Sequence, residues 1–397
     1  MAYIMISLVS VLVLCISAAE GRKTLHPING EADGICKTLV ERQGYTCEEH
    51  TVTTDDGYIL SLQRMPAAQS GMKANKSPVL LQHGIISDAI SWLFNHPNES
   101  LAFILADNGY EVWLVNTRGT RYSNQHRSLS PDDKAYWDWS WDQLTAYDLP
   151  ASVQYVNNNT GQKLHFVGHS LGTLIALSAL SQDKVLDSLS SAALLSPIAY
   201  LDKISSHPTK IAADIFLGDV VYWLGLRKFN PIGDGGSKLL EHMCNLPFIK
   251  CKNLFTLFTG PNCCINLSTI DVFLNHHPQP TSTKNLIHLA QMIRSGKIAM
   301  YDYGDQEQNM AHYGQASPPL YDMTRIPNDF PLFLSYGGQD TLSDVKDVQV
   351  LLDNLKDHDK DKLVVAFMED YAHMDFVMGV NAKQVLYDNM MAFFDQA

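Results

Sequence analysis

The most restrictive segment for the fold is KLHFVGHSLGTLIALSAL, residues 163–180. It places an apolar, strand-like run directly before the pattern GHSLG at 168–172, and a helix-like run directly after it. At a sharp strand-to-helix turn, a serine hydroxyl stands above the sheet edge, and the flanking glycines let neighbouring backbone approach. We therefore predict that Ser170 is a nucleophile. An ordinary helix N-cap is the alternative, because serine also caps helices well.

Strand-like and helix-like segments alternate along most of the chain. Residues 46–54 and 58–66 are joined by an Asp-Gly turn, which is a hairpin signal. The other expected strands are 77–84, 110–119, 163–170, 191–200, 329–340 and 362–373, and the expected helices are 99–109, 140–159, 171–182, 343–357 and 381–396. Such alternation predicts an α/β fold with a mainly parallel sheet and helices on both faces.

The alternation is interrupted between residues 197 and 325, where the chain is helical in pattern and contains cysteines. We expect one α/β domain over residues 20–397, with residues 197–325 inserted as a cap or lid. Within it, the apolar stretch 211–226 is either the core of the cap or a lid face that meets lipid.

A nucleophilic serine needs a base, and the base needs a carboxylate to orient it. In this type of fold the acid and then the histidine follow the serine along the chain. Asp340 ends a predicted strand after two glycines, and His373, the last histidine, follows the final strand. We predict that they complete a triad, although a packed loop histidine is the alternative for His373. Asp344 and Asp347 are expected to be a helix N-terminal charge and a solvated residue.

Acyl transfer also needs donors for the oxyanion. The backbone N–H of Leu171, directly after the nucleophile, is one expected donor. The second is the N–H of Ile85, in the loop after the strand that ends in LLQHG. His83 in that loop is expected to brace it by hydrogen bonds rather than to react.

The N-terminal segment is typical of a secretory leader. An apolar run is followed by Ser-Ala-Ala, which predicts a signal peptide over residues 1–19. A membrane anchor is the alternative, but the run is shorter than the roughly 20 residues that span a bilayer. Later in the chain we expect no transmembrane segment. The N-glycosylation candidates Asn98, Asn158 and Asn266 agree with secretion.

Removal of the leader would leave six cysteines, namely Cys36, Cys47, Cys244, Cys251, Cys263 and Cys264. In an oxidising compartment some of them should pair, and Cys36–Cys47 is the best pair because the two lie together and far from the others. The pairing of the other four stays open. Zinc is the alternative, although the spacings lack the paired C-x-x-C of zinc sites. We expect no metal and no cofactor.

Composition narrows the classes of partner. The chain has 397 residues, is 46% hydrophobic and carries a net charge of −13, so it can build a large core and lacks the basic patch that nucleic acid requires. The three tryptophans in AYWDWSWDQL, residues 135–144, are expected to pack at a helix start, with a carbohydrate-stacking site as the alternative.

Several ordered motifs resemble the eukaryotic acid lipase family, which includes gastric and lysosomal acid lipases, and the plant triacylglycerol lipase branch most of all. They run from CEEHTVTTDDGYILSLQRMP through LQHGIISDAISW, VGHSLGT and NCCINLSTIDVFL to YGGQDTLSDVKDV and EDYAHMDFVMG. The resemblance implies an α/β-hydrolase fold with a helical cap, a triad of Ser170, Asp340 and His373, and metal-free hydrolysis of neutral lipid esters. The gastric branch has Gln where this chain has Leu171, and its cysteine spacing differs.

These observations predict a secreted serine lipase that hydrolyses carboxylic esters of neutral lipids such as triacylglycerol at a lipid–water interface. Delivery to a vacuole or lysosome would use the same signal peptide. Two alternatives stay open for the function: an esterase or acyltransferase acting on non-glyceride acyl esters, and a non-catalytic ligand receptor on the same scaffold.

Overall fold

The computed structural model describes residues 34–230 and 256–397. The expected signal peptide, Cys244 and Cys251 lie outside the described residues.

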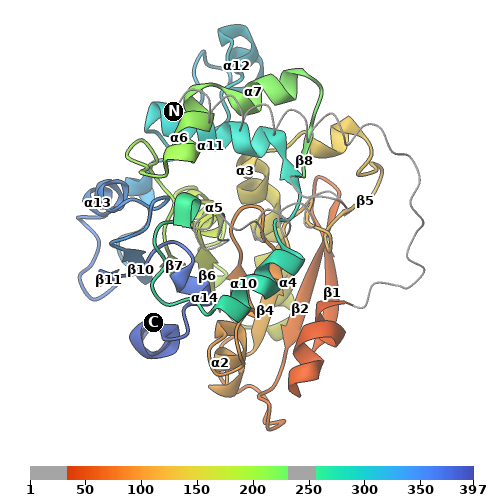
Figure 1. Ribbon diagram of the computed structural model, residues 1–397, viewed down its shortest axis with the longest axis vertical. Coiled ribbons are helices and arrows are strands. Elements are labelled where there is room, and N and C mark those ends of the chain that lie inside the picture. Colours follow the sequence, from red (N-terminus) through yellow and green to blue (C-terminus); the bar gives the residue numbers. More distant parts are fainter. Residues whose placement is uncertain (1–33, 231–255) are drawn as a thin grey trace, which may run out of the picture.

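The centre of the molecule is a twisted sheet with nine strands in the described residues (Figure 1). Its order is β1 (Glu48–Thr53), β2 (Tyr58–Met65), β4 (Val112–Val115), β3 (Val79–Gln82), β6 (Leu164–His169), β7 (Leu189–Leu195), β10 (Leu332–Gly337) and β11 (Leu363–Met368), with β5 (Gln125–His126) on β2. The β1–β2 hairpin is antiparallel, and from β4 to β11 every pair is parallel. The predicted mainly parallel sheet is confirmed.

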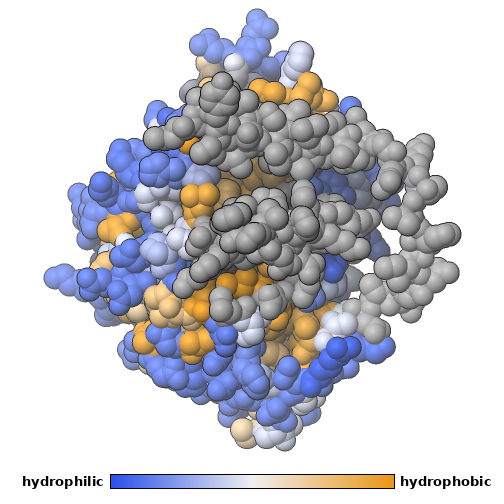
Figure 2. All heavy atoms as spheres, viewed as in Figure 1, coloured by the Kyte–Doolittle hydropathy of each residue, from blue (hydrophilic) through white to orange (hydrophobic). Residues whose placement is uncertain are grey.

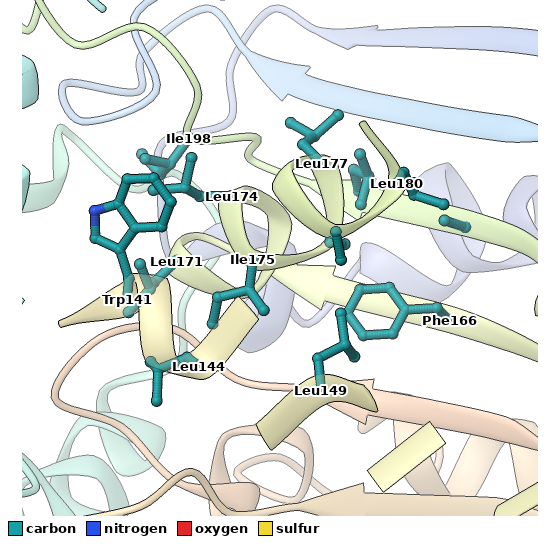
Figure 3. Packing of buried hydrophobic residues seen from close by; sticks show 14 of the residues in the cluster. Trp141, Leu144, Leu149, Phe166, Leu171, Leu174, Ile175, Leu177, Leu180 and Ile198 are labelled. Carbon is teal, nitrogen blue, oxygen red and sulfur yellow. The ribbon is translucent and has the colours of Figure 1, made fainter. Parts of the chain in front are cut away.

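Helices cover both faces of this sheet, because buried parallel strands present apolar side chains to both sides. One core includes Phe166 of β6 and lies under α4 (Leu149–Thr160), α5 (Leu171–Leu180) and α13 (Val345–Asn354). Figure 3 shows α5 in this core, with Leu171 close to Trp141. The other core includes Val167, the next residue of β6, and lies under α2 (Leu101–Asp107), α14 (Asp375–Met378) and α15 (Asp388–Phe394).

Several short helical turns complete this framework. They are η1 (Cys36–Val40), η2 (Glu41–Gln43), η3 (Ala89–Trp92), η4 (Lys134–Trp137), η6 (Met323–Arg325) and η7 (Lys383–Tyr387). The predicted helix 140–159 consists of α3 (Trp141–Gln143), the wider π-helical turn η5 (Leu144–Asp148) and α4. Pro150, the second residue of α4, lies just after this π-helical turn, and the backbone is helical on both sides of the junction. A proline inside a helix removes one backbone hydrogen bond, so its position beside the wider turn accounts for the local irregularity.

The segment 197–325 lies between β7 and β10, which are hydrogen-bonded neighbours, so it leaves the sheet uninterrupted. Its described elements are α6 (His207–Asp214), α7 (Leu217–Trp223), α10 (Leu267–His276), α11 (Thr283–Ser295) and α12 (Gln306–Tyr313), with the two-residue strands β8 (Lys228–Phe229) and β9 (Thr281–Ser282). In Figure 1, α6, α7, α11 and α12 gather at the top of the view, beyond the sheet. None of the helices in the described ranges combines the length and the apolar character needed to cross a bilayer.

Glycines let α5 pack closely against the sheet. A Cβ at Gly172 would lie 2.6 Å from the carbonyl oxygen of Gln82 in β3, and a Cβ at Gly168 would lie 2.8 Å from the carbonyl carbon of Gly172. Because these neighbours are backbone atoms, they cannot move aside as a side chain would. The start of α5 is therefore fixed relative to β3 and β6.

A buried arginine links three segments on the other side of β3. Arg118, in the loop after β4, is fully buried. Its guanidinium contacts Asp148 at 2.6 Å and Asp56, in the β1–β2 turn, at 2.6 Å. Burial alone would lower the pKa of Arg118, but Asp148 and Asp56 together raise it, so the cation stays charged. This group joins the hairpin, the β4 loop and the start of α4.

We predict that Arg118→Met lowers the free energy of unfolding by about 3–5 kcal/mol, because it leaves Asp148 as a buried carboxylate without its cation. Arg64→Met is the control, since Arg64 pairs with Glu48 and Glu111 at a partly exposed site and should cost about 1 kcal/mol or less. Urea unfolding of both variants measures the difference. Equal losses would contradict this reading of Arg118.

We predict that Gly172→Ala lowers the free energy of unfolding by about 1–3 kcal/mol, because the new methyl group overlaps backbone of β3. Gly218→Ala in α7 is the matched control, since its Cβ would lie 3.0 Å from a side-chain carbon of Ile287 and no closer than 3.8 Å to backbone atoms. That helical substitution should be neutral or stabilise by up to about 1 kcal/mol. Thermal unfolding distinguishes the two, and a neutral Gly172→Ala would refute the packing argument.

Candidate active site

Ser170 occupies the turn between β6 and α5 in a strained backbone conformation, with φ 55° and ψ −123°. This region is sparsely populated by residues other than glycine, and such strain is concentrated at functional sites. The Ser170 side chain makes no capping hydrogen bond to α5. Instead, its Oγ lies 2.8 Å from His373 Nε2. Ser170 therefore stands at the N-cap position of α5, but its side chain does not cap the helix as the alternative requires.

His373 lies between β11 and α14, and its Nδ1 is 2.9 Å from Oδ2 and 3.1 Å from Oδ1 of Asp340. A carboxylate only accepts, so Nδ1 carries the hydrogen and Nε2 can accept from the Ser170 hydroxyl. Burial would raise the pKa of Asp340, but His373, the Ser196 hydroxyl and the N–H of Ser343 together lower it. Asp340 is thus held as a carboxylate facing the imidazole.

The structure brings the three residues proposed from the sequence, Ser170, His373 and Asp340, into one hydrogen-bonded chain. The two neighbouring aspartates lie outside it. Asp344 caps α13 by accepting from the N–H of Lys346, in agreement with an N-terminal charge. The prediction that Asp347 is solvated is wrong, because its side chain is buried against the N–H of Lys203 and burial raises its pKa to about 7.

Further contacts hold the loop that carries His373. His169 Nε2 donates to the backbone carbonyl of His373 at 2.9 Å, and burial lowers the pKa of His169 to about 3, so this imidazole is neutral. Asp375 accepts from the N–H groups of Ala372, Cys263 and Cys264 at 2.8 to 3.1 Å. The contacts of His169 with His373 and of Asp375 with Cys263 and Cys264 were not predicted from the sequence, because each joins residues more than 100 positions apart.

The loop after β3 passes directly over Ser170. A Cβ at Gly84 would lie 2.9 Å from Ser170 Cβ, so only glycine allows this approach. Ile85 and Leu171 line the same small cavity beside the turn. The assignment of their N–H groups as oxyanion donors stays a prediction.

His83 braces this loop in the way expected. Its Nδ1 donates to the carbonyl of Gly84 at 2.7 Å, and its Nε2 accepts from the N–H of Thr117 at 3.1 Å. Burial lowers the pKa of His83 to about 4, so it is a neutral hydrogen-bonding group. The N–H of Gln279, in the segment between α10 and α11, donates to the carbonyl of Ile86 at 2.7 Å and also supports the loop.

Disulfides join Cys36 to Cys47, the pair expected, and Cys263 to its neighbour Cys264. Among the described residues, Cys263, Cys264 and Asp375 form a group whose atoms are close enough to hold a metal ion. The two sulfurs are bonded to each other, so this group offers no thiolates to zinc. The glycosylation candidates Asn98, Asn158 and Asn266 are all exposed.

The three tryptophans of residues 135–144 are buried in the protein core. They pack inside the protein as expected and have no exposed face on which a carbohydrate could stack. The stretch 211–226 differs, because many of its apolar side chains are exposed. They are Ile211, Ile215, Phe216, Val220, Trp223 and Leu224, with Trp223 85% exposed. Figure 2 shows hydrophobic residues gathered at the top of the view, over α7.

Two family models match the chain. One describes a partial alpha/beta-hydrolase lipase region and matches residues 36–96, and the other describes the alpha/beta hydrolase fold and matches residues 77–228. Among solved structures, a monoglyceride lipase from Saccharomyces cerevisiae has a TM-score of 0.54 at 16% identity and covers 94% of this chain and 99% of its own. The expected α/β-hydrolase fold is confirmed.

Sequence relatives match over almost the whole length. Triacylglycerol lipase 2 of Arabidopsis thaliana is 47% identical over 96% of this chain and 94% of its own. Triacylglycerol lipase 1 of the same plant is 42% identical over 93% of this chain and 92% of its own. Gastric triacylglycerol lipase of Homo sapiens is 34% identical over 94% of both chains. The chain therefore belongs to the α/β-hydrolase family of lipases that contains the plant triacylglycerol lipases and the gastric triacylglycerol lipases.

Proposed function

We propose that this protein is a serine lipase that hydrolyses carboxylic esters of neutral lipids such as triacylglycerol. One observation carries the proposal: Ser170 Oγ lies 2.8 Å from His373 Nε2, and Nδ1 of the same ring lies 2.9 Å from Asp340 Oδ2. The named activity of the relatives supports the substrate class, because their similarity covers more than 90% of both chains.

The geometry supports a two-step acyl transfer. Ser170 Oγ attacks the ester carbonyl carbon while His373 Nε2 takes the hydroxyl proton, and the carbonyl electrons move to the oxyanion. We propose that the N–H groups of Ile85 and Leu171 bind this oxyanion. The carbonyl re-forms as the alcohol leaves with the proton from His373. Water then attacks the acyl-enzyme by the same route and releases the fatty acid.

The exposed apolar residues of α6 and α7 support a contact with lipid. A surface of this kind on a soluble domain usually marks an interaction site. We propose that residues 197–325 form a cap whose α6–α7 face meets the lipid–water interface. We further propose that residues 1–19 direct secretion, with delivery to a vacuole or lysosome as the alternative, and that Asn98, Asn158 and Asn266 are the positions for glycans.

The hydrogen-bonded chain also bears on the alternatives. A ligand receptor has no need for a strained serine opposite an oriented imidazole, so this geometry disfavours it. An esterase or acyltransferase on non-glyceride esters would use the same three residues, and only substrates can separate it from a lipase.

We predict that Ser170→Ala reduces kcat by about 10⁴-fold or more, since it removes the attacking oxygen. Asp340→Asn should reduce kcat by about 10⁴-fold, because the amide favours the wrong imidazole tautomer. Both substitutions are close in size to the original residue, and circular dichroism establishes that each variant is folded. Initial rates on a soluble p-nitrophenyl ester measure the effect. Wild-type rates in folded Ser170→Ala would disprove the proposed function.

We predict that the enzyme prefers emulsified long-chain triacylglycerol to soluble short-chain esters. Trp223→Ser should lower the rate on the emulsion at least about threefold, through loss of apolar contact with the interface, and leave the rate on the soluble ester unchanged. Met72→Ser, an exposed apolar residue in the loop after β2, is the control. A preference for soluble esters, with both variants alike, would favour the esterase alternative.

A further inference from the structure

We infer that Ser196 is a positioning residue, whose hydroxyl fixes the Asp340 carboxylate and the His373 imidazole in the geometry that ester hydrolysis requires. The inference rests on the proposed function, because it gives Ser196 a role only in a reaction that uses His373 as a base. It adds a fourth side chain to the three identified by sequence motif.

The position of Ser196 in the sheet explains why it reaches this pair. It directly follows β7, which lies between β6 and β10. The N–H of Ser170 donates to the carbonyl of Leu195 at 3.2 Å, and the N–H of Ser196 donates to the carbonyl of Ser335 at 2.8 Å. Backbone hydrogen bonds therefore fix Ser196 between the strand that leads to Ser170 and the strand that leads to Asp340.

The Ser196 hydroxyl touches both members of the pair. Its Oγ donates to Asp340 Oδ2 and lies 2.8 Å from His373 Nδ1. A hydroxyl has one hydrogen, and Ser196 donates it to the carboxylate in a hydrogen bond. The hydroxyl oxygen can therefore accept a hydrogen bond from Nδ1–H of His373. The imidazole hydrogen is thus shared between Ser196 and Asp340, and the three groups form a closed triangle.

The two oxygens of Asp340 are anchored differently. Oδ1 accepts from the backbone N–H groups of Leu342 and Ser343 at 2.9 and 2.8 Å. Oδ2 instead accepts from the side chains of Ser196 and His373. Without Ser196, the carboxylate could pivot about Oδ1 and carry the imidazole with it. Small errors of this kind are costly, because catalysis depends on close alignment.

The backbone adds an independent observation. Ser196 has φ 54°, in the left-handed region that favours glycine. The side chain is fully buried and contacts the reacting groups rather than solvent. Glycine would adopt this backbone more easily than serine. The strained backbone of Ser196, together with its two side-chain contacts, therefore points to a role for the hydroxyl.

The other described polar groups around His373 do not hydrogen-bond to its Nδ1 atom. His169, from β6, is neutral, and its hydrogen bond to His373 goes to the backbone carbonyl, while the two rings lie 4.9 Å apart between centroids. The Asp375 carboxylate, from α14, is occupied by three backbone N–H groups. Ser170 meets the opposite ring nitrogen, Nε2. Among the described residues, the side chains at His373 Nδ1 are those of Asp340 and Ser196.

The test uses the full-length enzyme with Ser196→Ala and Ser196→Gly, and both remove the hydroxyl. Ser191→Ala is the matched control, since Ser191 is a buried serine on the same strand whose hydroxyl contacts His165 instead. On a soluble ester, both Ser196 variants should lose about tenfold to a hundredfold in kcat, with KM within about twofold of wild type. Ser191→Ala should keep the wild-type kcat.

The pH profile of kcat/KM separates positioning from packing. Without the hydroxyl, Asp340 Oδ2 and His373 Nδ1 each lose one hydrogen-bond partner, so the surroundings of the imidazole change. The acidic limb of the profile should therefore move in both Ser196 variants. A role in packing alone would lower the whole profile without moving the limb.

Three results would overturn the inference. They are wild-type kcat in both Ser196 variants, an unmoved acidic limb, and full activity in Ser196→Gly alone, which would mean that only the backbone matters. Thermal unfolding sets an assay temperature at which every variant is folded. If loss of the side chain prevents folding, Ser196→Cys keeps its size with a weaker donor and should show the same loss of kcat. Activity of wild type and its absence in Ser170→Ala test the proposed function separately.

Discussion

The structure depends on one constraint, the sharp turn at Ser170 between a central parallel strand and the helix that packs back against it. Ser170 holds this turn with φ 55°, and Gly168 and Gly172 allow the helix to lie against β3 and β6. A residue with a Cβ at either glycine would push the helix away from the sheet. The same packing that closes the core therefore also fixes the hydroxyl at the edge of the sheet.

Parallel topology brings the other groups to this edge. The neighbouring strands β6, β7, β10 and β11 run in one direction, so the residues after them arrive on one side of the sheet. Ser170 follows β6, Ser196 follows β7, Asp340 follows β10, and His373 follows β11. Four adjacent strands thus contribute one polar side chain each, and their backbone hydrogen bonds set the spacing. Residues 197–325 lie between β7 and β10 in the sequence, and the two strands still pair in parallel register.

Much of this arrangement could be predicted from the sequence. The alternation of strands and helices gave the parallel sheet, and the order of Ser170, Asp340 and His373 along the chain identified the residues that the structure brings together. Local sequence patterns are enough to predict these three residues, because each one follows a recognisable strand. The disulfide between Cys36 and Cys47 could also be predicted, because the two cysteines are close in sequence.

Ser196 and the burial of Asp347 could not be predicted. The strand was expected to continue to residue 200, yet β7 ends at Leu195, because the left-handed backbone of Ser196 turns the chain toward Asp340. No local pattern indicates a contact between side chains 144 and 177 positions apart. Asp347 is a polar residue in the first turn of α13, and its burial depends on a tertiary contact, in which its carboxylate accepts from the N–H of Lys203. The burial of Asp347 and the contacts of Ser196 depend on tertiary structure, which local sequence propensity does not reveal.

The most direct test of the central claim, that Ser170 is the nucleophile, is covalent labelling followed by mass spectrometry. A fluorophosphonate forms a stable bond with a serine oxygen that an adjacent base activates. We expect one adduct per chain, on the peptide that contains Ser170, with ester hydrolysis lost in proportion to labelling. An adduct on Ser196 or another serine, or full hydrolysis by the labelled protein, would contradict it.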